Sequence, residues 1–524
     1  MAAVNKIDSN VTGLRIAKET SFGTLPGTPI WYALEPNSYG DFGGNVTTVA
    51  RETINDSRSR LKGVTTDVEA TGNFESDLTQ QSLAHLFEGL MYAAYDKKAE
   101  RFNNHTAASV ITDASASADD FTFTTGDAFR DGDLVFASGF TNAANNGLHL
   151  ADATSGATVL SVTSAVTDEV PPALAKLVTV GFEFSTGDAA IDVSGTFPAL
   201  DTVSKDLTQL GVSVGEFVYL GGDAADEKFF NSANNGWARV KSITTNTMTF
   251  DKSSAAMVTD DGTDDGSAGT GQTIRIFFGR TVQNKVGSDI SRTSYQLERK
   301  LGAPDDDLAK TTEIQSEYVT GAILNEFTLN LPTADKITTE MTFVGKDTEQ
   351  RTGATGVKSG TRPATSTADA FNGSSHVTRF RLAPVSATNE FPDATFAFVM
   401  EGSVTINNNN SRNQAIGTLG AFECSSGTFE VSAEVTAYFQ NVTTLQSIRN
   451  NDDMTLDVAM VQDNAGIIID LPLLTVSGGL AGVELNEPVK LPLSVDAAQA
   501  TTVDSAYTHT AKICVFDYLP DAAE

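Results

Sequence analysis

The clearest hydrophobic pattern in the chain lies within Thr47–Met91, where an alternating stretch runs into a helical one. Within Phe74–Leu78, apolar or small residues alternate with two carboxylates, and residues two apart share one face of a strand. The apolar residues that follow have the spacing of one helix face. They are Leu83, Leu86, Phe87, Leu90, Met91 and Ala94. We therefore predict a strand and an amphipathic helix that together cover one core.

A related pattern recurs in the C-terminal part of the chain. The residues common to the two copies are Thr53, Ile54, Asn55, Arg58, Gly63, Gly72 and Phe74 in the first, and Thr405, Ile406, Asn407, Arg412, Gly417, Gly427 and Phe429 in the second. The step from the arginine to the next glycine is five residues in both copies. Phe429–Phe439 then alternates regularly, and a shorter helix is predicted at Thr444–Arg449. Chance similarity of short β patterns is the alternative to a duplicated structural core.

Residues 105–270 differ in character and contain two self-similar pieces. In each piece a strand, a glycine-rich loop, an Asn-Asn-Gly turn and a further strand follow in order, and Ala144–Gly147 matches Ala233–Gly236. This repeat predicts two small β modules, at about 118–180 and 181–255, inserted as an outer decoration. If they are decoration, their deletion leaves assembly intact.

Together these patterns predict a mainly β chain with a duplicated core, a flanking helix and inserted β modules. The predicted parts are a discontinuous first core at 1–104 and 271–350 that begins with an extended arm at 1–46, the insertion at 105–270, a Gly-, Ser- and Thr-rich linker at 351–375, and a second core at 376–524. The aromatic residues of the arm pack either on its own core or on a neighbouring subunit, and the sequence leaves both open.

The chain has 67 acidic and 35 basic residues, a formal net charge of −32. A surface this negative repels phosphate, so binding to a nucleic-acid backbone is disfavoured, whereas DNA as a passenger is compatible with it. An ordinary solubilising acidic surface is the alternative interpretation. No stretch approaches the roughly 18 continuous apolar residues of a membrane span, and the start MAAVNKIDSN lacks a secretory signal. We expect a soluble protein made in a cytoplasm, with no membrane partner.

No constellation in the sequence predicts catalysis, a cofactor or a metal site, so we expect a protein that is not an enzyme. The five histidines lie far apart, and none has another ligand residue at metal-binding spacing. Asp260–Asp265 offers the carboxylate oxygens that Ca²⁺ prefers, but it lacks the EF-hand pattern, and a solvated loop is favoured. Cys424 and Cys514 are expected to be buried, reduced thiols.

Taken in order, several segments resemble the tail tube proteins, or major tail proteins, of siphophages, which are bacteriophages with long non-contractile tails. The segments are Thr28–Ser38, Thr47–Arg58, Lys62–Gln80, Ser294–Gly302 and Ile406–Phe422. The resemblance implies a virion structural protein with a duplicated tail-tube core, a β-sandwich or β-barrel flanked by a helix. Its rings would stack into the hollow tube through which DNA passes into the host.

The resemblance also implies the partners and the location. Rings of this family generally show six core domains, so two cores per chain favour a trimeric ring with pseudo-sixfold symmetry over a hexameric ring of chains. The other implied partners are the tape measure protein and DNA in the lumen, and the tail terminator and distal tail proteins. The location is the phage tail, after assembly in the bacterial host cytoplasm. The hairpins around 295–325 and 455–470 are the candidates for lining the lumen.

Two other functions remain open at this point. A β-rich tail fibre or carbohydrate-binding adhesin would suit the Gly- and Asn-rich insertion, but adhesins usually expose aromatic platforms, and Trp237 is the only tryptophan of the insertion. A polysaccharide-degrading enzyme would need a paired acid and base, which the sequence does not single out.

Overall fold

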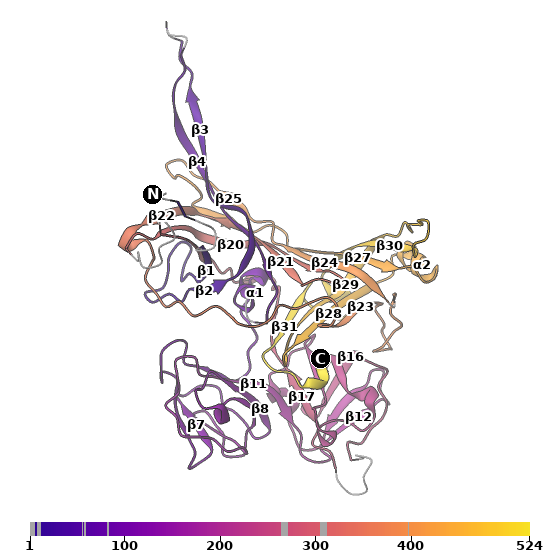
Figure 1. The fold of residues 1–524 in the computed structure, drawn as a ribbon. Coiled ribbons are helices and arrows are strands. Elements are labelled where there is room, and N and C mark those ends of the chain that lie inside the picture. Colours follow the sequence, from indigo (N-terminus) through magenta and orange to yellow (C-terminus); the bar gives the residue numbers. More distant parts are fainter. Residues whose placement is uncertain are drawn as a thin grey trace.

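The computed structural model of the protein is mainly β, which confirms the predicted fold class (Figure 1). It describes residues 6–7, 12–54, 56, 59–80, 83–263, 271–303, 312–396 and 398–524. The main sheet has 16 strands. Two smaller β modules lie below it in Figure 1, and a long hairpin projects above it.

The first half of the main sheet is built from two separate parts of the sequence. Before the insertion it contains β1 (Gly13–Lys18), β2 (Tyr32–Leu34), β3 (Pro36–Arg51), β4 (Leu61–Asp77) and helix α1 (Ala84–Met91). After the insertion it contains β19 (Tyr295–Gly302), β20 (Gln315–Leu331), β21 (Thr338–Gly345) and β22 (Asp347–Thr352).

The second half follows without interruption. It contains β23 (Val377–Pro384), β24 (Val399–Asn407), β27 (Glu430–Tyr438), helix α2 (Thr443–Asn450), β28 (Met454–Gln462), β29 (Ala465–Gly478), β30 (Lys490–Ala497) and β31 (Lys512–Phe516). Between β24 and β27, the short strands β25 (Ser411–Asn413) and β26 (Glu423–Ser425) pair with each other as a separate two-stranded sheet. One further strand, β18 (Arg280–Gln283), falls in the range predicted for the first core but pairs with β31.

The strands of the two halves pair in the same order. In the first half β1 pairs β19, β19 pairs β20, and β20 pairs β21 and β22. β21 then pairs β4, and β4 pairs β3. In the second half the same places are taken by β23, β28, β29, β30, β31, β27 and β24. A helix follows β4 in one half and β27 in the other, so the chain holds one topology twice.

Strands β20 and β24 join the two halves into one sheet. They run antiparallel from Glu326 opposite Asn407 to Leu331 opposite Gly402. Phe327 and Ile406 face each other across this joint and are 2% and 0% exposed. One apolar core therefore continues from the first half into the second.

Helix α1 forms where the apolar spacing predicts it, with its apolar side against this core. The rings of Phe87 and Phe327 meet edge to face, with centroids 5.9 Å apart. At Gly89 a side chain would collide with the ring of Tyr295, whose hydroxyl donates to the carbonyl of His85 at 3.0 Å. The helix therefore lies close to β19.

The insertion contains two apolar cores rather than one. Its strands are β5 (Glu100–Phe102), β6 (Ile111–Ser115), β7 (Asp120–Phe123), β8 (Asp133–Ser138), β9 (Gly147–Leu150), β10 (Val159–Ser161), β11 (Lys176–Glu183), β12 (Ala189–Asp192), β13 (Ala199–Thr202), β14 (Phe217–Leu220), β15 (Gly236–Ile243), β16 (Thr247–Ser253) and β17 (Arg275–Phe278). The apolar core of the first module spans Ile111–Leu177, and that of the second module spans Phe182–Phe278. The second module extends beyond residue 255 because β17 pairs with β11 and β14.

The Asn-Asn-Gly turns have the same structural role in both modules. The side chain of Asn146 accepts from the N–H of Phe140 at 3.0 Å and donates to its carbonyl at 2.9 Å. Asn235 makes the same two hydrogen bonds with Phe229, at 3.0 and 2.8 Å. The glycine after each asparagine has a φ of 112° or 115°, which side chains disfavour. The repeated motif is therefore a loop clamp.

The second module packs against the second half of the main sheet and forms one of its walls. The rings of Trp237 and Phe516 meet edge to face, 5.2 Å apart. The hydroxyl of Tyr219 donates to the carbonyl of Ala522 at 2.6 Å. An apolar cluster across this boundary also buries Val461 and Ile468. The module therefore covers an apolar face of the core.

The predicted linker, 351–375, lies along the first half of the fold. Phe371 is 0% exposed, and its N–H donates to the carbonyl of Leu78 at 2.9 Å. The N–H of Trp31, in the N-terminal arm, donates to the carbonyl of Thr361 at 2.8 Å. Trp31 is itself fully buried. Aromatic anchors therefore hold both the linker and this part of the arm against their own chain.

Candidate functional site

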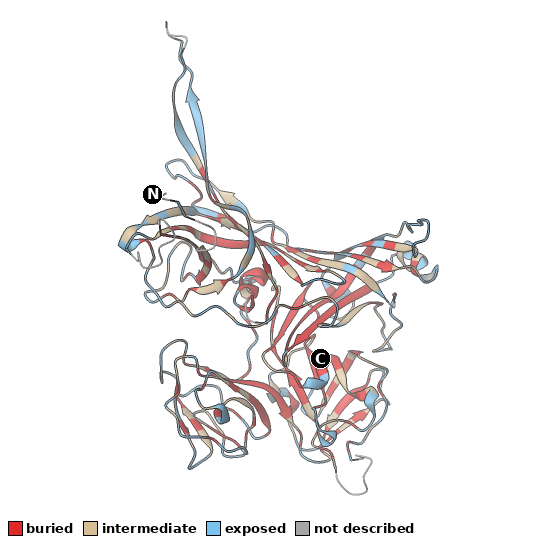
Figure 2. Cartoon of the chain, in the orientation of Figure 1, coloured by how far each residue is buried: buried red, intermediate tan, exposed pale blue. Residues whose placement is uncertain are grey.

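The joined sheet has one face toward the apolar core and one face away from it. The face away from the core is polar from one side of the sheet to the other, and along each strand exposed residues alternate with buried ones (Figure 2). Residues opposite one another form two rows across β4, β21, β20, β24, β27, β30 and β29. The first row is Glu75, Glu340, Thr328, Thr405, Ser432, Asp496 and Thr475. The second row is Asp77, Thr338, Asn330, Ser403, Glu434, Ser494 and Ser477. We call these two rows the polar face.

The polar face is acidic and includes no lysine or arginine. It has three carboxylates in the first row and two in the second. Intervening residues such as Met341 and Val404 point inward and are 1% exposed, because successive side chains of a strand alternate between its two faces. The hydroxyls of Thr328 and Thr405 lie 3.0 Å apart across the joint. The polar face is therefore continuous over both halves.

The loop between β24 and β27 reaches from the second half onto the first. The side chain of Asn408 donates to the carbonyl of Leu90, at the end of α1, at 3.0 Å. Arg412 donates to the carbonyl of Val68 at 3.0 Å and pairs with Asp67 at 3.3 Å. These contacts reinforce the joint between β20 and β24.

Two strand edges equivalent to those of the joint remain open within the described parts of the chain. β24 pairs with β27 and β20, whereas its counterpart β3 pairs only with β4. β20 pairs with β24 beyond Glu326, whereas its counterpart β29 has no strand on that side beyond Leu474. An unpaired edge is a template for another strand. The described residues thus form one closed joint and leave two open edges of the same kind.

Exposed apolar side chains accompany both open edges. Those on the β3–β4 hairpin are Val46, Val49, Leu61 and Val64, which are 52%, 54%, 43% and 64% exposed. Those between β29 and β30 are Leu480, Val483 and Leu485, which are 87%, 78% and 90% exposed. Figure 1 shows the hairpin and the end of the sheet near β30 well separated from each other. Clustered exposed apolar residues mark interaction surfaces.

The structure places the Thr-Ile-Asn part of the predicted motif differently in the two halves. In the second half Ile406 is buried in β24, and Thr405 and Asn407 lie on either side of it. In the first half Thr53 and Ile54 lie beyond the end of β3, and Ile54 is fully exposed. Asn55 and Arg58 lie outside the described residues. The shared letters therefore do not occupy equivalent positions.

The other motif residues also differ in their surroundings. Phe74 is 3% exposed and stacks on Phe343 with centroids 6.1 Å apart, whereas Phe429 is only half-buried at the margin of the core. The four motif glycines are Gly63 and Gly72 in β4, and Gly417 and Gly427 in the loop between β24 and β27. At Gly72 a side chain would collide with Leu297, whereas Gly417 has open space around it. The repeat therefore lies in the order of strands rather than in these residues.

The hairpins expected to line a lumen do not form a free surface. Every residue of β28 and the first ten residues of β29, Ala465–Leu474, are buried. Tyr295–Glu298 of β19 is buried as well. The expectation for 455–470 is wrong because the second inserted module covers these strands. The polar face replaces them as the candidate surface.

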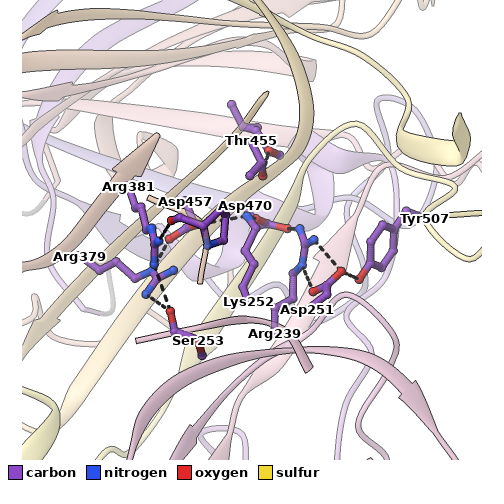
Figure 3. Close-up of polar contacts among 12 residues, drawn as sticks. Arg239, Asp251, Lys252, Ser253, Arg379, Arg381, Thr455, Asp457, Asp470 and Tyr507 are labelled. Carbon is purple, nitrogen blue, oxygen red and sulfur yellow. Dashed lines mark hydrogen bonds and ion pairs between the residues drawn. The ribbon is translucent and has the colours of Figure 1, made fainter. Parts of the chain in front are cut away.

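A buried ionic cluster, which the sequence did not reveal, joins the second module to the second half (Figure 3). Lys252 lies 3.0 Å from Asp457 and 2.6 Å from Asp470. The other members are Arg239, which pairs with Asp470 and Asp251 at 2.9 Å each, and Arg379, which pairs with Asp457. Burial alone would raise the pKa of Asp457, but the charges of Arg379 and Lys252 hold it well below its usual range.

The first half contains an equivalent cluster. Arg15 of β1 lies opposite Glu298 of β19, as Arg381 of β23 lies opposite Asp457 of β28. Glu298 is 1% exposed and pairs with Arg362 of the predicted linker at 2.5 Å. A cation from outside the sheet therefore neutralises a buried carboxylate in each half. No local pattern reveals such pairs, because the partners are far apart in the sequence.

No group of three or more His, Cys, Asp and Glu residues suited to a metal ion occurs among the residues that the structure describes. In the acidic loop, Asp260 accepts from the backbone N–H of Gly262 at 3.0 Å and from the side chain of Asn234 at 3.3 Å. Asp264 and Asp265 lie outside the described residues. Cys424 and Cys514 are free and buried. In the described parts of the chain no helix has the length and apolarity to cross a membrane.

A duplicated sheet with an internal joint, two matching open edges and a continuous polar face defines a β-structured assembly protein. The model of one family, described as "Phage tail tube protein", matches residues 9–237 and 201–497. The chain therefore belongs to the phage tail tube protein family. Membership makes it a component of the virion, implies self-assembly into a tube, and favours a structural rather than an enzymatic role.

The remaining comparisons add little. No curated protein matches the chain. Among solved structures, the "Phage phi92 endosialidase" is 10% identical, with 90% of this chain and 70% of that chain covered, at a TM-score of 0.13. A likeness this weak carries no conclusion about fold or function.

Proposed function

We propose that this chain is the tail tube protein of a siphophage and that three copies close into a ring with pseudo-sixfold symmetry. The joint between β20 and β24 carries the proposal, because it is a lateral contact already made within one chain. The edge that β20 uses in this joint is open on its counterpart β29, and the edge that β24 uses is open on its counterpart β3. In the ring, β29 of one chain therefore pairs with β3 of the next. Head-to-tail contacts of this kind close into rings. A hexameric ring of chains is the alternative, and the mass per ring separates the two.

The units that build the ring are the first core, at 1–104 and 271–350, and the second core, at 376–524. The identical strand order of the two halves supports this division. The insertion at 105–270 then lies outside the ring, and 351–375 connects the units.

The polar face lines the channel in this arrangement. Its carboxylates repel the phosphates of DNA over about a Debye length, ~10 Å, so that DNA slides without binding. The tape measure protein occupies the same channel before DNA does. The projecting β3–β4 hairpin reaches the next ring, and tail terminator and distal tail proteins close the ends of the stacked rings. Assembly takes place in the host cytoplasm.

Replacing Leu480 with Asp is expected to abolish ring formation and to leave the monomer folded. Leu480 is 87% exposed, so a polar residue there changes the free energy of unfolding by less than about 0.5 kcal/mol. In the proposed ring the same side chain is covered by the next chain, where an unpaired carboxylate is costly. Light scattering after size exclusion gives the mass, and negative-stain microscopy shows whether hollow tubes form.

Val203→Asp is the matched control, since Val203 is 86% exposed on the second inserted module. It is expected to form tubes as the parent protein does. Tubes from Leu480→Asp, or discrete glycan-binding particles from the parent protein, would contradict the proposal.

Changing Glu340 and Glu434 to Lys is expected to make the channel bind DNA. Each substitution adds two units of positive charge to the polar face, and such contacts weaken steeply as salt rises. Tubes are incubated with short duplex DNA, and retention is measured at low and high salt. Asp127→Lys with Asp131→Lys, two exposed positions on the first module, adds the same charge outside the channel. Equal DNA retention by both double variants would place the polar face on the outside.

A further inference from the structure

A cavity of about 360 Å³ lies where the second inserted module meets the second half of the main sheet. Its walls come from β15 and β16 of the module and from β23 and β28 of the sheet, and the loop 385–392 forms part of its rim. Cavities of this size hold small molecules. All the residues that line it belong to one chain, so the cavity is complete in the monomer.

Most of the charges around this cavity are already paired. The buried ionic cluster described above uses three cations and three carboxylates. Lys241 pairs with Asp504 at 2.6 Å. At the rim, the carboxylate of Glu390 accepts from the N–H of Met257 at 3.1 Å, and Asp453 is exposed to solvent.

Arg381 also lines the cavity, and unlike the other lining cations it makes no ion pair with a carboxylate of the described residues. Its guanidinium donates to two backbone carbonyls, those of Ser253 at 3.4 Å and of Pro392. It lies over the ring of Phe391 at 3.8 Å, and no carboxylate of the described residues lies within 4.0 Å of it. Burial, and then the charge of Arg379, lowers the pKa of Arg381 to about 10. Asp457 and Asp393 oppose this shift from beyond ion-pair distance. The fold therefore holds a guanidinium beside a cavity with no carboxylate of the described residues in direct contact with it.

The geometry points to a binding site for a small anion whose carboxylate or phosphate group pairs with Arg381 inside this cavity. A guanidinium presents parallel N–H donors that match the two oxygens of either group. Phe391 on one face of the guanidinium and the two carbonyls fix its orientation. Inorganic phosphate and an acidic sugar such as galacturonate share the required chemistry.

Isothermal titration calorimetry of the full chain with sodium phosphate and with sodium galacturonate, at constant ionic strength, tests the site. Saturable binding of one of the two is expected, and the anion that binds identifies the source. Arg381→Gln should weaken it by about tenfold or more, since a charge-assisted contact is lost. Arg351→Gln, an arginine of β22 remote from the cavity, should bind as the parent protein does.

A second variant keeps the test decisive if Arg381→Gln fails to fold. The hydroxyl of Ser386, at the rim, accepts from the N–H groups of Thr388 and Asn389 at 3.3 and 3.0 Å. Ser386→Asp preserves an acceptor for this turn and adds a negative charge to the cavity, so it should abolish anion binding. Absence of saturable binding with both anions, or unchanged affinity in these variants, overturns the inference.

Discussion

Excising Ser185–Thr273 and joining Phe184 to Ile274 is expected to leave the second half of the protein unfolded or insoluble. The N–H of Phe184 donates to the carbonyl of Ile274 at 2.9 Å, so a short Gly-Ser link spans the gap. The excision removes Trp237 and the rest of the module that covers β28 and β29. It also removes Lys252 and Arg239, which leaves Asp470 without a paired cation and Asp457 with Arg379 alone, on an exposed apolar sheet. The summed loss approaches the whole stability of a domain, about 5–15 kcal/mol.

The fraction of soluble protein, circular dichroism and the protease resistance of the second half measure this outcome. Excising Asn104–Leu174 is the matched control, because that first module has its own apolar core and the N–H of Asn103 donates to the carbonyl of Ala175 at 3.1 Å. This control should stay soluble and form tubes. Normal tubes after the Ser185–Thr273 excision would restore the interpretation of both modules as decoration.

Replacing Asp470 with Ala is expected to lower the free energy of unfolding of the second half by about 3–5 kcal/mol. Asp470 is 0% exposed and pairs with Lys252 at 2.6 Å and with Arg239 at 2.9 Å. Its removal leaves a net positive charge in a buried site. The shift of the urea midpoint measures the cost. Glu487→Ala breaks the exposed pair with Lys490 and should cost less than about 1 kcal/mol.

The loss of stability in Asp470→Ala is expected to come from the unbalanced charge and not from lost packing. Combining Asp470→Ala with Lys252→Met removes one charge of each sign, so the double variant should recover part of the lost stability. The cluster also predicts a pH dependence. Because the pKa of Asp457 is lowered in the folded state, its contribution is present above its ordinary pKa of 3.8 and is lost as the pH falls below that value. A double variant no more stable than the single one would show that packing dominates.

Local patterns predicted the features that depend on neighbours in the sequence. The alternation around Phe74 and in Phe429–Phe439 predicted strands with one apolar face, and β4 and β27 have it. The apolar spacing after Leu83 predicted α1. The repeated Asn-Asn-Gly turns predicted two similar modules, which the structure contains.

Features that depend on coverage were not predicted. The strands at 455–470 were expected on an open surface, but the second module buries them. The composition of 351–375 predicted a linker between the cores, but it gave no sign that Phe371 would be buried in the core of the first half. The Thr-Ile-Asn match suggested a duplicated core, and the two halves do share one strand order. The matched residues themselves are not equivalent, since Ile406 is buried and Ile54 is exposed.

The sequence by itself determined which side chains share a strand face, where α1 and the module turns form, and that the chain is acidic and mainly β. These properties follow from periods of two or 3.6 residues and from composition, which are local or additive. Only the tertiary structure decided which faces are covered, which strand edges stay open, and which distant charges such as Lys252 and Asp470 meet. Those outcomes depend on contacts between segments far apart in the chain, and no local period encodes them.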